Sequence, residues 1–279
     1  MKILIFGATG LIGSNLYKYL SKNNYDVFGT YRNQQSYQIL SNENYKKLLY
    51  FDFHNINVDI YKFVNNIKPD VIINCIGITK HINESVENFI RVNSLFPHQL
   101  AKVSNKLDAR FIQISTDCVF SGKKGFYSET DIPDADDLYG RSKILGEVTY
   151  DNHLTVRIST IGKELRTSYG LLNWFLNTKG SCNGYSKAIF SGIPSIYFAY
   201  ILLNFIIPNN ELAGLYHISS EPIDKFSLLK ILKNFYQVNT NIIEDNTFSI
   251  DRSLDCSKFS RVTGYVLPTW EQLILPEWM

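Results

Sequence analysis

Tyr139 and Lys143 stand four residues apart in the segment Tyr-Gly-Arg-Ser-Lys, a spacing that suits acid–base chemistry. On a helix, side chains four positions apart share a face. A free tyrosine has a pKa of about 10, and a neighbouring ammonium favours the phenolate and lowers that pKa. We therefore expect Tyr139 to give a proton to a carbonyl oxygen while hydride reaches the carbon. The alternative is an exposed helix that carries two unrelated surface residues.

The apolar run before this pair ends in hydroxyl groups. Residues 112–117 read Ile-Gln-Ile-Ser-Thr-Asp, which predicts a strand with Ser115 and Thr116 at its carboxyl end. A hydroxyl at this place can hold a substrate oxygen and help to polarise a carbonyl group. Taken alone, either hydroxyl could equally cap a turn.

Three glycines near the start of the chain, Gly7, Gly10 and Gly13, follow a predicted strand and open a predicted helix. Glycines permit a tight turn and a close approach to a pyrophosphate, and the helix N-terminus offers N–H groups to the anion. This context predicts a dinucleotide site; a glycine-rich turn without a ligand is the alternative. The turn residues expected to contact the cofactor are Gly7, Thr9, Gly10, Leu11, Ile12 and Gly13.

The second predicted strand ends at Arg32, with no acidic residue nearby to bind a ribose 2′-hydroxyl. Because an arginine suits the 2′-phosphate, NADP(H) is favoured and NAD(H) stays open. Asp52 and Phe53 follow the third strand and are expected to bind the cofactor, with Asp52 in contact with the adenine. The alternative is that Asp52 caps the next helix. After the fourth strand, the residues expected beside the cofactor are Cys75, Ile76 and Gly77.

Short apolar runs alternate with helical patterns through the first 158 residues. Continuous apolar strands separated by helices predict an α/β fold with a doubly wound parallel sheet of the Rossmann type. The expected strands are 3–6, 26–30, 48–51, 71–76, 111–114 and 155–158, and the expected helices are 11–20, 58–66, 84–104 and 138–150. Residues 1–160 are the expected dinucleotide-binding domain.

Residues 161–279 are expected to form a smaller substrate-binding lobe, interleaved with the first domain and placed where parallel strands end. Glycine and serine turns are expected at 180–184 and 191–192, and helices at 195–207 and 225–236, with an apolar run at 215–218 between the helices.

Composition excludes several other classes of protein. The 279 residues carry a formal net charge of +2, which gives no concentrated basic surface for nucleic acid or an anionic membrane. The four cysteines have no CxxC or zinc-like spacing, so we expect free thiols and no metal. The apolar run 193–207 is shorter than the ~20 residues of a membrane span. With a strand instead of a secretory segment at residues 2–6, a cytoplasmic protein is expected.

Three segments together resemble the extended short-chain dehydrogenases/reductases, in particular the dTDP-4-dehydrorhamnose reductase family. They are residues 7–13 (Gly-Ala-Thr-Gly-Leu-Ile-Gly), 115–122 (Ser-Thr-Asp-Cys-Val-Phe-Ser-Gly) and 139–147 (Tyr-Gly-Arg-Ser-Lys-Ile-Leu-Gly-Glu). The likeness covers about the first 160 residues well. It implies Thr116, Tyr139 and Lys143 as the catalytic set.

The resemblance also implies a sugar nucleotide bound by the C-terminal lobe. The predicted substrate-binding residues are Thr79, Asp117, Val119, Arg157 and Arg252, the arginines as ligands of the diphosphate. Asn93 matches an asparagine near the family's site and is included among the cofactor residues; a helix-surface amide is the alternative.

The residue after Asp117 separates the reactions that the family catalyses. In the related 4,6-dehydratases, the resemblance implies a Thr-Asp-Glu pattern at these positions. This chain has Thr116, Asp117 and Cys118 there, so a cysteine replaces the glutamate. A thiol cannot replace the glutamate base, which argues against dehydration and leaves simple reduction of a ketone. The resemblance implies that the substrate is a nucleoside-diphospho 4-keto-6-deoxysugar, reduced with NAD(P)H for bacterial surface polysaccharide precursors. A C-4 epimerase with bound NAD and a non-catalytic regulatory subunit remain alternatives. The sugar and base stay open, and a homodimer is possible.

Overall fold

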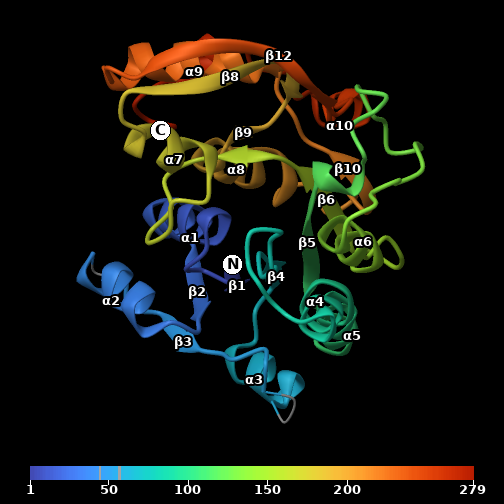
Figure 1. Cartoon of the computed structure of the whole chain (residues 1–279). Helices are drawn as coiled ribbons and strands as arrows, with labels where there is room; N and C mark the ends of the chain where they lie inside the picture. The colour runs from blue at the N-terminus through green and yellow to red at the C-terminus, as the bar shows by residue number, and fades with distance from the viewer. Residues whose placement is uncertain (44, 56–57) are drawn as a thin grey trace.

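Seven parallel strands form the central sheet of the computed structural model, which describes residues 1–43, 45–55 and 58–279 (Figure 1). The strand order is β10-β6-β5-β4-β1-β2-β3. Its first six strands in chain order have the 3-2-1-4-5-6 arrangement of dinucleotide-binding folds, which confirms the predicted doubly wound sheet. The strands are β1 (Lys2–Phe6), β2 (Asp26–Tyr31), β3 (Leu48–Tyr50), β4 (Val71–Asn74), β5 (Arg110–Thr116), β6 (Leu154–Ile158) and β10 (Gly214–His217).

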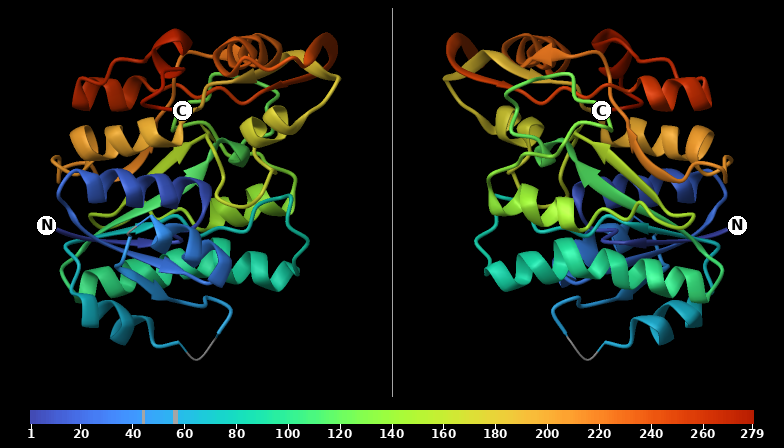
Figure 2. Two further views of the ribbon diagram at one scale, coloured as in Figure 1. Left: turned by 90° about the vertical axis from the view of Figure 1, so that its left-hand side faces the viewer. Right: turned by 90° about the vertical axis from the view of Figure 1, so that its right-hand side faces the viewer.

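Both faces of this sheet are buried because helices cover each of them (Figure 2). Along β1, Ile3 and Ile5 pack into one apolar cluster while Leu4 and Phe6 pack into the other. Helix α1 (Leu11–Lys22) belongs to the first cluster, and α3 (Ile60–Ile67) belongs to the second. Alternate residues thus serve opposite faces, which is why the strands read as continuous apolar runs.

The remaining helices of the nucleotide half are α2 (Gln34–Asn42), α4 (Val86–Phe89), α5 (Phe96–Lys106) and α6 (Leu138–Leu145). A π-helical segment, Ile90–Leu95, joins α4 to α5. The predicted helix 84–104 is therefore a continuous helical segment whose middle turns are π-helical. Helix α6 stops at Leu145 rather than reaching residue 150. Gly146 is the C-cap residue, and a glycine is required there because a Cβ would lie 1.8 Å from the Asn93 carbonyl oxygen.

A second, three-stranded sheet lies above the first, in the order β11-β8-β12 (Figure 1). Its strands are β11 (Ile223–Asp224), β8 (Ser181–Phe190) and β12 (Asn241–Asp251), and α9 (Lys225–Tyr236) packs against it. The prediction of a glycine turn at residues 180–184 is wrong from Ser181 onward, where β8 begins. Gly184 lies within β8, where a Cβ would meet the Phe226 Cα at 2.9 Å, so this glycine admits α9 instead of making a turn.

The rest of the C-terminal half returns to the central sheet. The predicted apolar run 215–218 forms β10, which pairs with β6. The predicted helix 195–207 forms α8 (Ser195–Ile201), which packs against α1, and a π-helical turn, Leu202–Ile206, which continues it. Smaller elements are β7 (Thr160–Ile161), β9 (Ile193–Pro194), α7 (Leu171–Asn177), α10 (Ser257–Thr263) and α11 (Trp270–Leu273).

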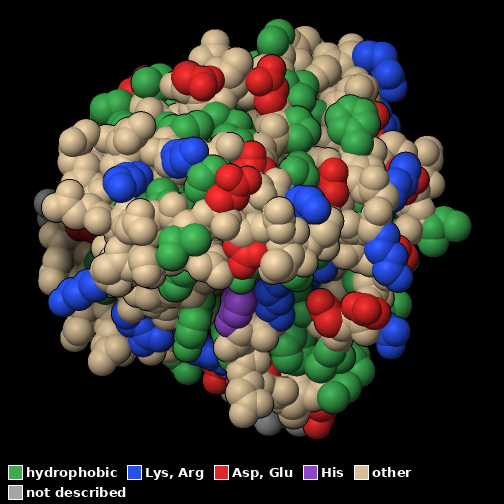
Figure 3. All heavy atoms as spheres, turned by 45° about the horizontal axis from the view of Figure 1, so that its top comes forward, with side chains coloured by type: hydrophobic (Ala, Val, Ile, Leu, Met, Phe, Trp, Pro, Cys, Tyr) green, Lys and Arg blue, Asp and Glu red, His purple; other side chains and the backbone are tan. Residues whose placement is uncertain are grey.

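Charges of both signs are interspersed over the face that carries the second sheet (Figure 3). This pattern agrees with the small net charge and gives this face no broad basic surface. In the part of the chain that the structure describes, no helix combines the length and apolarity needed to cross a membrane. The same residues contain no cluster of three or more His, Cys, Asp or Glu side chains placed to hold a metal ion.

Candidate active site

The glycine turn after β1 is closed so tightly that side chains would not fit. Gly7 has a φ of +80°, and a Cβ on Gly13 would lie 2.1 Å from the Gly7 carbonyl oxygen. The Gly7 N–H donates to Thr30 Oγ1 at 2.9 Å, which ties the turn to β2. Gly10 precedes α1 and supplies no capping side chain, so the first N–H groups of the helix are left for an anion. This cradle fits a pyrophosphate.

Arg32 and Phe53 meet beyond the ends of β2 and β3. The Arg32 guanidinium lies 4.6 Å from the centre of the Phe53 ring, an arrangement that favours attraction between the cation and the ring. Phe53 also lines a pocket of about 320 Å³. Asp52 accepts the His54 N–H at 3.0 Å and so caps its own turn. Asp59 rather than Asp52 caps α3.

The loop after β4 passes directly beside the glycine turn. A Cβ on Gly7 would touch the Ile76 nitrogen at 3.1 Å and the Cys75 carbonyl carbon at 3.2 Å. Gly77 is exposed, and a Cβ there would lie 3.9 Å from Lys143 Nζ. The structure therefore brings the glycine turn, this loop and Lys143 to one edge of the sheet.

Asn93 holds that loop against the helix that carries Tyr139 and Lys143. Its side chain is fully buried and accepts the Ile78 N–H at 2.8 Å. Its amide donates to the Ile78 carbonyl at 2.9 Å and to Ser142 Oγ at 3.0 Å. The alternative of a helix-surface amide is wrong. These contacts position the loop after β4 against α6, and the expected contact of Asn93 with the cofactor stays a prediction.

The three predicted catalytic side chains converge where β5 ends. Helix α6 begins after Asp137, which accepts the Gly140 N–H at 2.6 Å and so fixes the first turn. This start carries the Tyr139 hydroxyl close to the Thr116 side chain, which acts on the pKa of Tyr139. One turn later, Lys143 Nζ donates to the Ile114 carbonyl oxygen at 2.8 Å.

The electrostatics of this trio differ from the expectation in one respect. Burial raises the pKa of Tyr139, and the nearby Cys118 adds to the effect, so the net lowering expected from Lys143 is wrong for this structure, in which burial dominates. Lys143 instead directs its ammonium to Ile114, and its charge interacts with Glu147 and Cys75. Burial lowers the pKa of Lys143 to about 8. The raised pKa keeps Tyr139 protonated at neutral pH, so its hydroxyl holds a proton that could be transferred.

Asp117 and Cys118 directly follow Thr116 at the carboxyl end of β5. Burial raises the pKa of Asp117, and the charge of Arg252 partly opposes that shift. Burial and the neighbouring Asp117 raise the pKa of Cys118 to about 12, so this residue is a thiol at neutral pH. A thiol in this state is no general base and no ready nucleophile.

The predicted substrate residues separate into two groups. Thr79 is exposed in the loop after Gly77, and Arg252 Nη1 lies 3.7 Å from Cys118 Sγ. Val119 and Arg157 are not retained as substrate ligands. Val119 is fully buried in an apolar cluster with Phe120, Tyr127 and Leu254.

Arg157 is buried because Glu147 pairs with it through two hydrogen bonds of 2.7 Å. Glu147 also accepts the Ser115 hydroxyl at 2.7 Å, and Arg157 contacts His217 at 3.3 Å. Sequence reasoning missed this network, although Glu147 follows Lys143 by the same spacing of four residues that links Tyr139 to Lys143.

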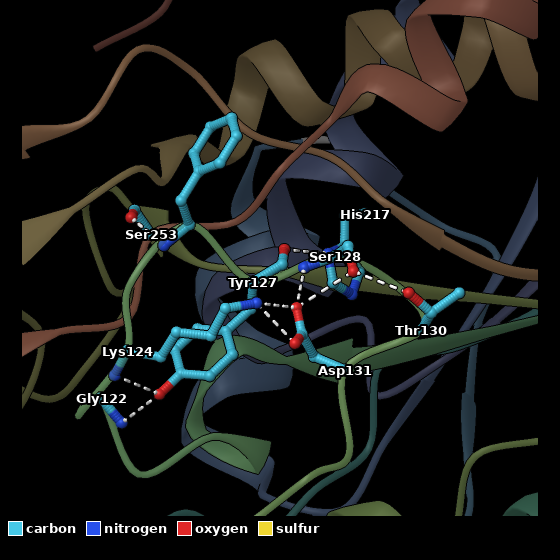
Figure 4. A network of polar contacts seen from close by, with 9 residues as sticks. Gly122, Lys124, Tyr127, Ser128, Thr130, Asp131, His217 and Ser253 are labelled. Carbon is cyan, nitrogen blue, oxygen red and sulfur yellow. Dashed lines mark hydrogen bonds and ion pairs between the residues drawn. The ribbon is translucent and has the colours of Figure 1, made fainter.

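A second network, centred on Tyr127, fixes the segment that carries Arg252 (Figure 4). The Tyr127 hydroxyl accepts the N–H groups of Gly122 and Lys124 at 3.2 and 3.0 Å. Its backbone N–H donates to the Ser253 carbonyl at 2.8 Å. The Arg252 Nε donates to the Phe120 carbonyl at 2.7 Å. Arg252 is thereby held against the loop that follows Thr116.

The strand order, the glycine turn and the helix with Tyr139 and Lys143 define the fold of the extended short-chain dehydrogenases/reductases. A family model described as the RmlD substrate binding domain matches residues 1–171. The chain belongs to this family.

Curated relatives fall into two kinds. Methionine adenosyltransferase 2 subunit beta of Bos taurus is 31% identical over 166 residues, 57% of this chain and 46% of that protein. The dTDP-4-dehydrorhamnose reductase of Aggregatibacter actinomycetemcomitans is 24% identical over 309 residues, 98% of this chain and 97% of that protein. The chain spans about half the length of the first-ranked relatives that it matches.

Solved structures share the fold of this protein over nearly the whole chain. A hypothetical dTDP-4-dehydrorhamnose reductase from Sulfolobus tokodaii superposes with a TM-score of 0.80 at 25% identity, covering 96% of this chain and 97% of that one. The dTDP-4-dehydrorhamnose reductase of Bacillus anthracis, in complex with NADP, gives 0.79 at 22% identity, covering 98% and 96%. The second likeness concerns the fold alone.

Proposed function

We propose that this protein reduces the 4-keto group of a nucleoside-diphospho 4-keto-6-deoxysugar with NAD(P)H. The observation that carries the proposal is the meeting of Thr116, Tyr139 and Lys143 at the sheet edge beside Gly77. The full-length likeness to the Aggregatibacter reductase supports the same reaction.

The roles of the three side chains follow from their contacts. The keto oxygen binds between the hydroxyls of Thr116 and Tyr139, and these polarise the carbonyl. Tyr139, kept protonated by its raised pKa, gives its proton to that oxygen. Lys143 supplies positive charge that stabilises the tyrosinate left behind. A reduced nicotinamide, held along the glycine turn and Gly77, would supply the hydride for C-4. The product is a 4-hydroxy sugar nucleotide.

NADP(H) is the favoured form of the cofactor. Arg32, which follows β2 and stacks on Phe53, supports this choice because an arginine after this strand suits a 2′-phosphate. The fold neighbour from Bacillus anthracis was solved with NADP. Phe53 and its pocket would face the adenine. NAD(H) is the second choice.

Dehydration is disfavoured because Cys118, a neutral thiol, stands where that reaction would need a carboxylate base. The likeness to methionine adenosyltransferase 2 subunit beta favours one other candidate, a non-catalytic subunit that keeps the fold. The complete trio of Thr116, Tyr139 and Lys143 argues for catalysis, since a purely binding subunit has no need of it.

A substrate panel tests the proposal. dTDP- and UDP-linked 4-keto-6-deoxysugars are incubated with NADPH or NADH, and absorbance at the nicotinamide band is followed. Consumption of reduced cofactor with one of these sugars supports the reductase. An epimerase would interconvert C-4 epimers of a sugar nucleotide without net loss of reduced cofactor. Absence of both activities would favour the non-catalytic subunit.

A further inference from the structure

A loop from the C-terminal half, residues 162–170, starts beside the glycine turn. It joins β7 to α7, and in Figure 1 it descends from α7 toward α1. A Cβ on Gly162 would lie 3.2 Å from Cδ1 of Leu11, the first residue of α1. The same Cβ would lie 2.4 Å from Ser195 Oγ, which accepts a hydrogen bond from Asn15 of α1 at 2.7 Å. The loop therefore begins next to the cradle that fits a pyrophosphate.

Two side chains of this loop reach the N-terminal half of the chain. Arg166 Nη1 donates to Gln35 Oε1 at 3.1 Å. The rings of Tyr169 and His81 lie nearly parallel, with their centroids 6.1 Å apart. Gln35 belongs to the first turn of α2, after β2, whereas His81 lies in the loop after β4. Since β1 lies between β2 and β4 in the sheet, the loop contacts segments on both sides of the glycine turn.

Hydrogen bonds within the loop and to α7 fix its shape. Glu164 Oε2 accepts the Gly170 N–H at 3.0 Å, which closes the loop on itself. The Asn173 side chain, from α7, accepts the Glu164 N–H at 3.2 Å and donates to the Thr167 carbonyl oxygen at 3.0 Å. These bonds flank Arg166 on both sides. The backbone at Arg166 is therefore held in place, while its exposed side chain is able to exchange partners.

The contact with Gln35 brings Arg166 to the end of β2. This strand ends at Tyr31, Arg32 follows it, and Asn33 caps α2 by accepting the Gln35 N–H at 3.0 Å. In dinucleotide-binding folds, the segment that follows this strand meets the 2′ position of the adenosine ribose. Gln35 is only three residues beyond Arg32. Two guanidinium groups, one from each half of the chain, thus approach the start of α2.

Neither of these two arginines has an acidic partner. Within residues 1–43, 45–55 and 58–279, no ion pair joins Arg32 or Arg166 to a carboxylate. Arg166 is bonded to a neutral amide oxygen, and Arg32 lies over the Phe53 ring. A guanidinium has five N–H donors, and its hydrogen bonds to a phosphate are stronger than those to a neutral acceptor. A phosphate group at this place would therefore displace the bond between Arg166 and Gln35.

We propose that Arg166, from the C-terminal half, is a second ligand of the 2′-phosphate of NADP(H), together with Arg32. The inference rests on the proposed function for the choice of cofactor, but it concerns binding and not reduction. The phosphate would connect the two halves of the chain, since each half supplies one of the arginines. NADH lacks this phosphate and would leave Arg166 bonded to Gln35. Arg166 thereby favours NADPH over NADH.

Binding of adenosine fragments, measured by calorimetry, tests this assignment without any turnover. The probes are adenosine 2′,5′-bisphosphate, which carries the 2′-phosphate, and adenosine 5′-monophosphate, which lacks it. The wild-type protein is expected to bind the bisphosphate more tightly. Arg166→Met should raise the Kd for the bisphosphate by about tenfold, the loss of one charge-assisted contact. Its Kd for the monophosphate should stay close to that of the wild type.

Arg261→Met is the matched control. Arg261 is an exposed arginine on α10, which packs against β10 at the opposite edge of the sheet from β2 and β3, so this variant should bind both fragments as the wild type does. Arg166→Lys keeps the charge without the planar group and should lose less affinity than Arg166→Met.

The inference is overturned if Arg166→Met binds the bisphosphate as tightly as the wild type does. It is also overturned if the variant weakens binding of both fragments equally, because that result would indicate a merely structural role for Arg166. Since binding is measured directly, the expected loss in a protein that reduces no sugar would refute the reductase alone.

Discussion

The Lys143 ammonium donates a 2.8 Å hydrogen bond to the carbonyl oxygen of Ile114, two residues before Thr116 on β5. This bond fixes the lysine between the catalytic helix and the strand that carries the hydroxyl. Lys143 is only 5% exposed, and burial lowers its pKa to about 8. A side chain held in this way can respond to pH within the range in which enzymes are assayed.

Reduction should therefore slow at alkaline pH. Below pH 8 Lys143 is charged, and as pH rises through about 8 it loses its proton and its stabilising effect on the tyrosinate. Tyr139 stays protonated over that range because its pKa is raised. We expect kcat to fall across this midpoint in a pH–rate profile. A kcat that stays level from pH 7 to 10 would contradict the assigned role of Lys143.

Arg32→Ala tests the choice of cofactor. Without the guanidinium that stacks on Phe53, the contact with a 2′-phosphate is lost, whereas NADH has no such group. The KM for NADPH should rise by about tenfold or more, equivalent to one charge-assisted bond, with little change for NADH. Equal effects on the two cofactors would show that Arg32 does not bind the phosphate.

Glu147→Gln tests the buried ion pair. The side chains of Arg157 and Glu147 are 3% and 8% exposed, so the variant leaves a buried guanidinium without its counterion. Such a loss costs about 3–5 kcal/mol of unfolding free energy, measurable by urea denaturation. Glu147 also raises the pKa of Lys143, so the alkaline fall in kcat should move to lower pH.

Glu87→Gln is the matched control for this experiment. Glu87 pairs with Arg91 on the surface and is 75% exposed, so its loss should cost about 0.5 kcal/mol or less. Similar destabilisation in both variants would show that burial of the Glu147 pair is not the source of its strength.

The first half of the fold could be predicted because its strands are buried on both faces. Runs such as Ile3–Phe6 read as apolar throughout, and the glycine turn marks where a helix must begin. Strand β12 was missed for the opposite reason. Its residues Asn241–Asp251 mix polar and apolar side chains and are mostly exposed, so no continuous apolar run marks the strand that pairs with β8.

Site residues could be predicted where chemistry follows from local spacing, as for Tyr139 and Lys143. Roles that depend on partners far away in the sequence could not be predicted. Arg157 looks like a phosphate ligand until Glu147 is known to pair with it. Asn93 could be a cofactor residue or a surface amide by sequence, and its buried contacts with Ile78 and Ser142 depend on partners that the sequence does not show.

The central claim is that Tyr139 donates the proton, and Tyr139→Phe tests it most directly. The variant keeps the ring and loses only the hydroxyl that meets Thr116. With NADPH and the sugar nucleotide identified by the panel, we expect kcat to fall by about 10²–10⁴-fold, while NADPH binds with unchanged affinity. Turnover close to that of the wild type would contradict the proposed reaction chemistry.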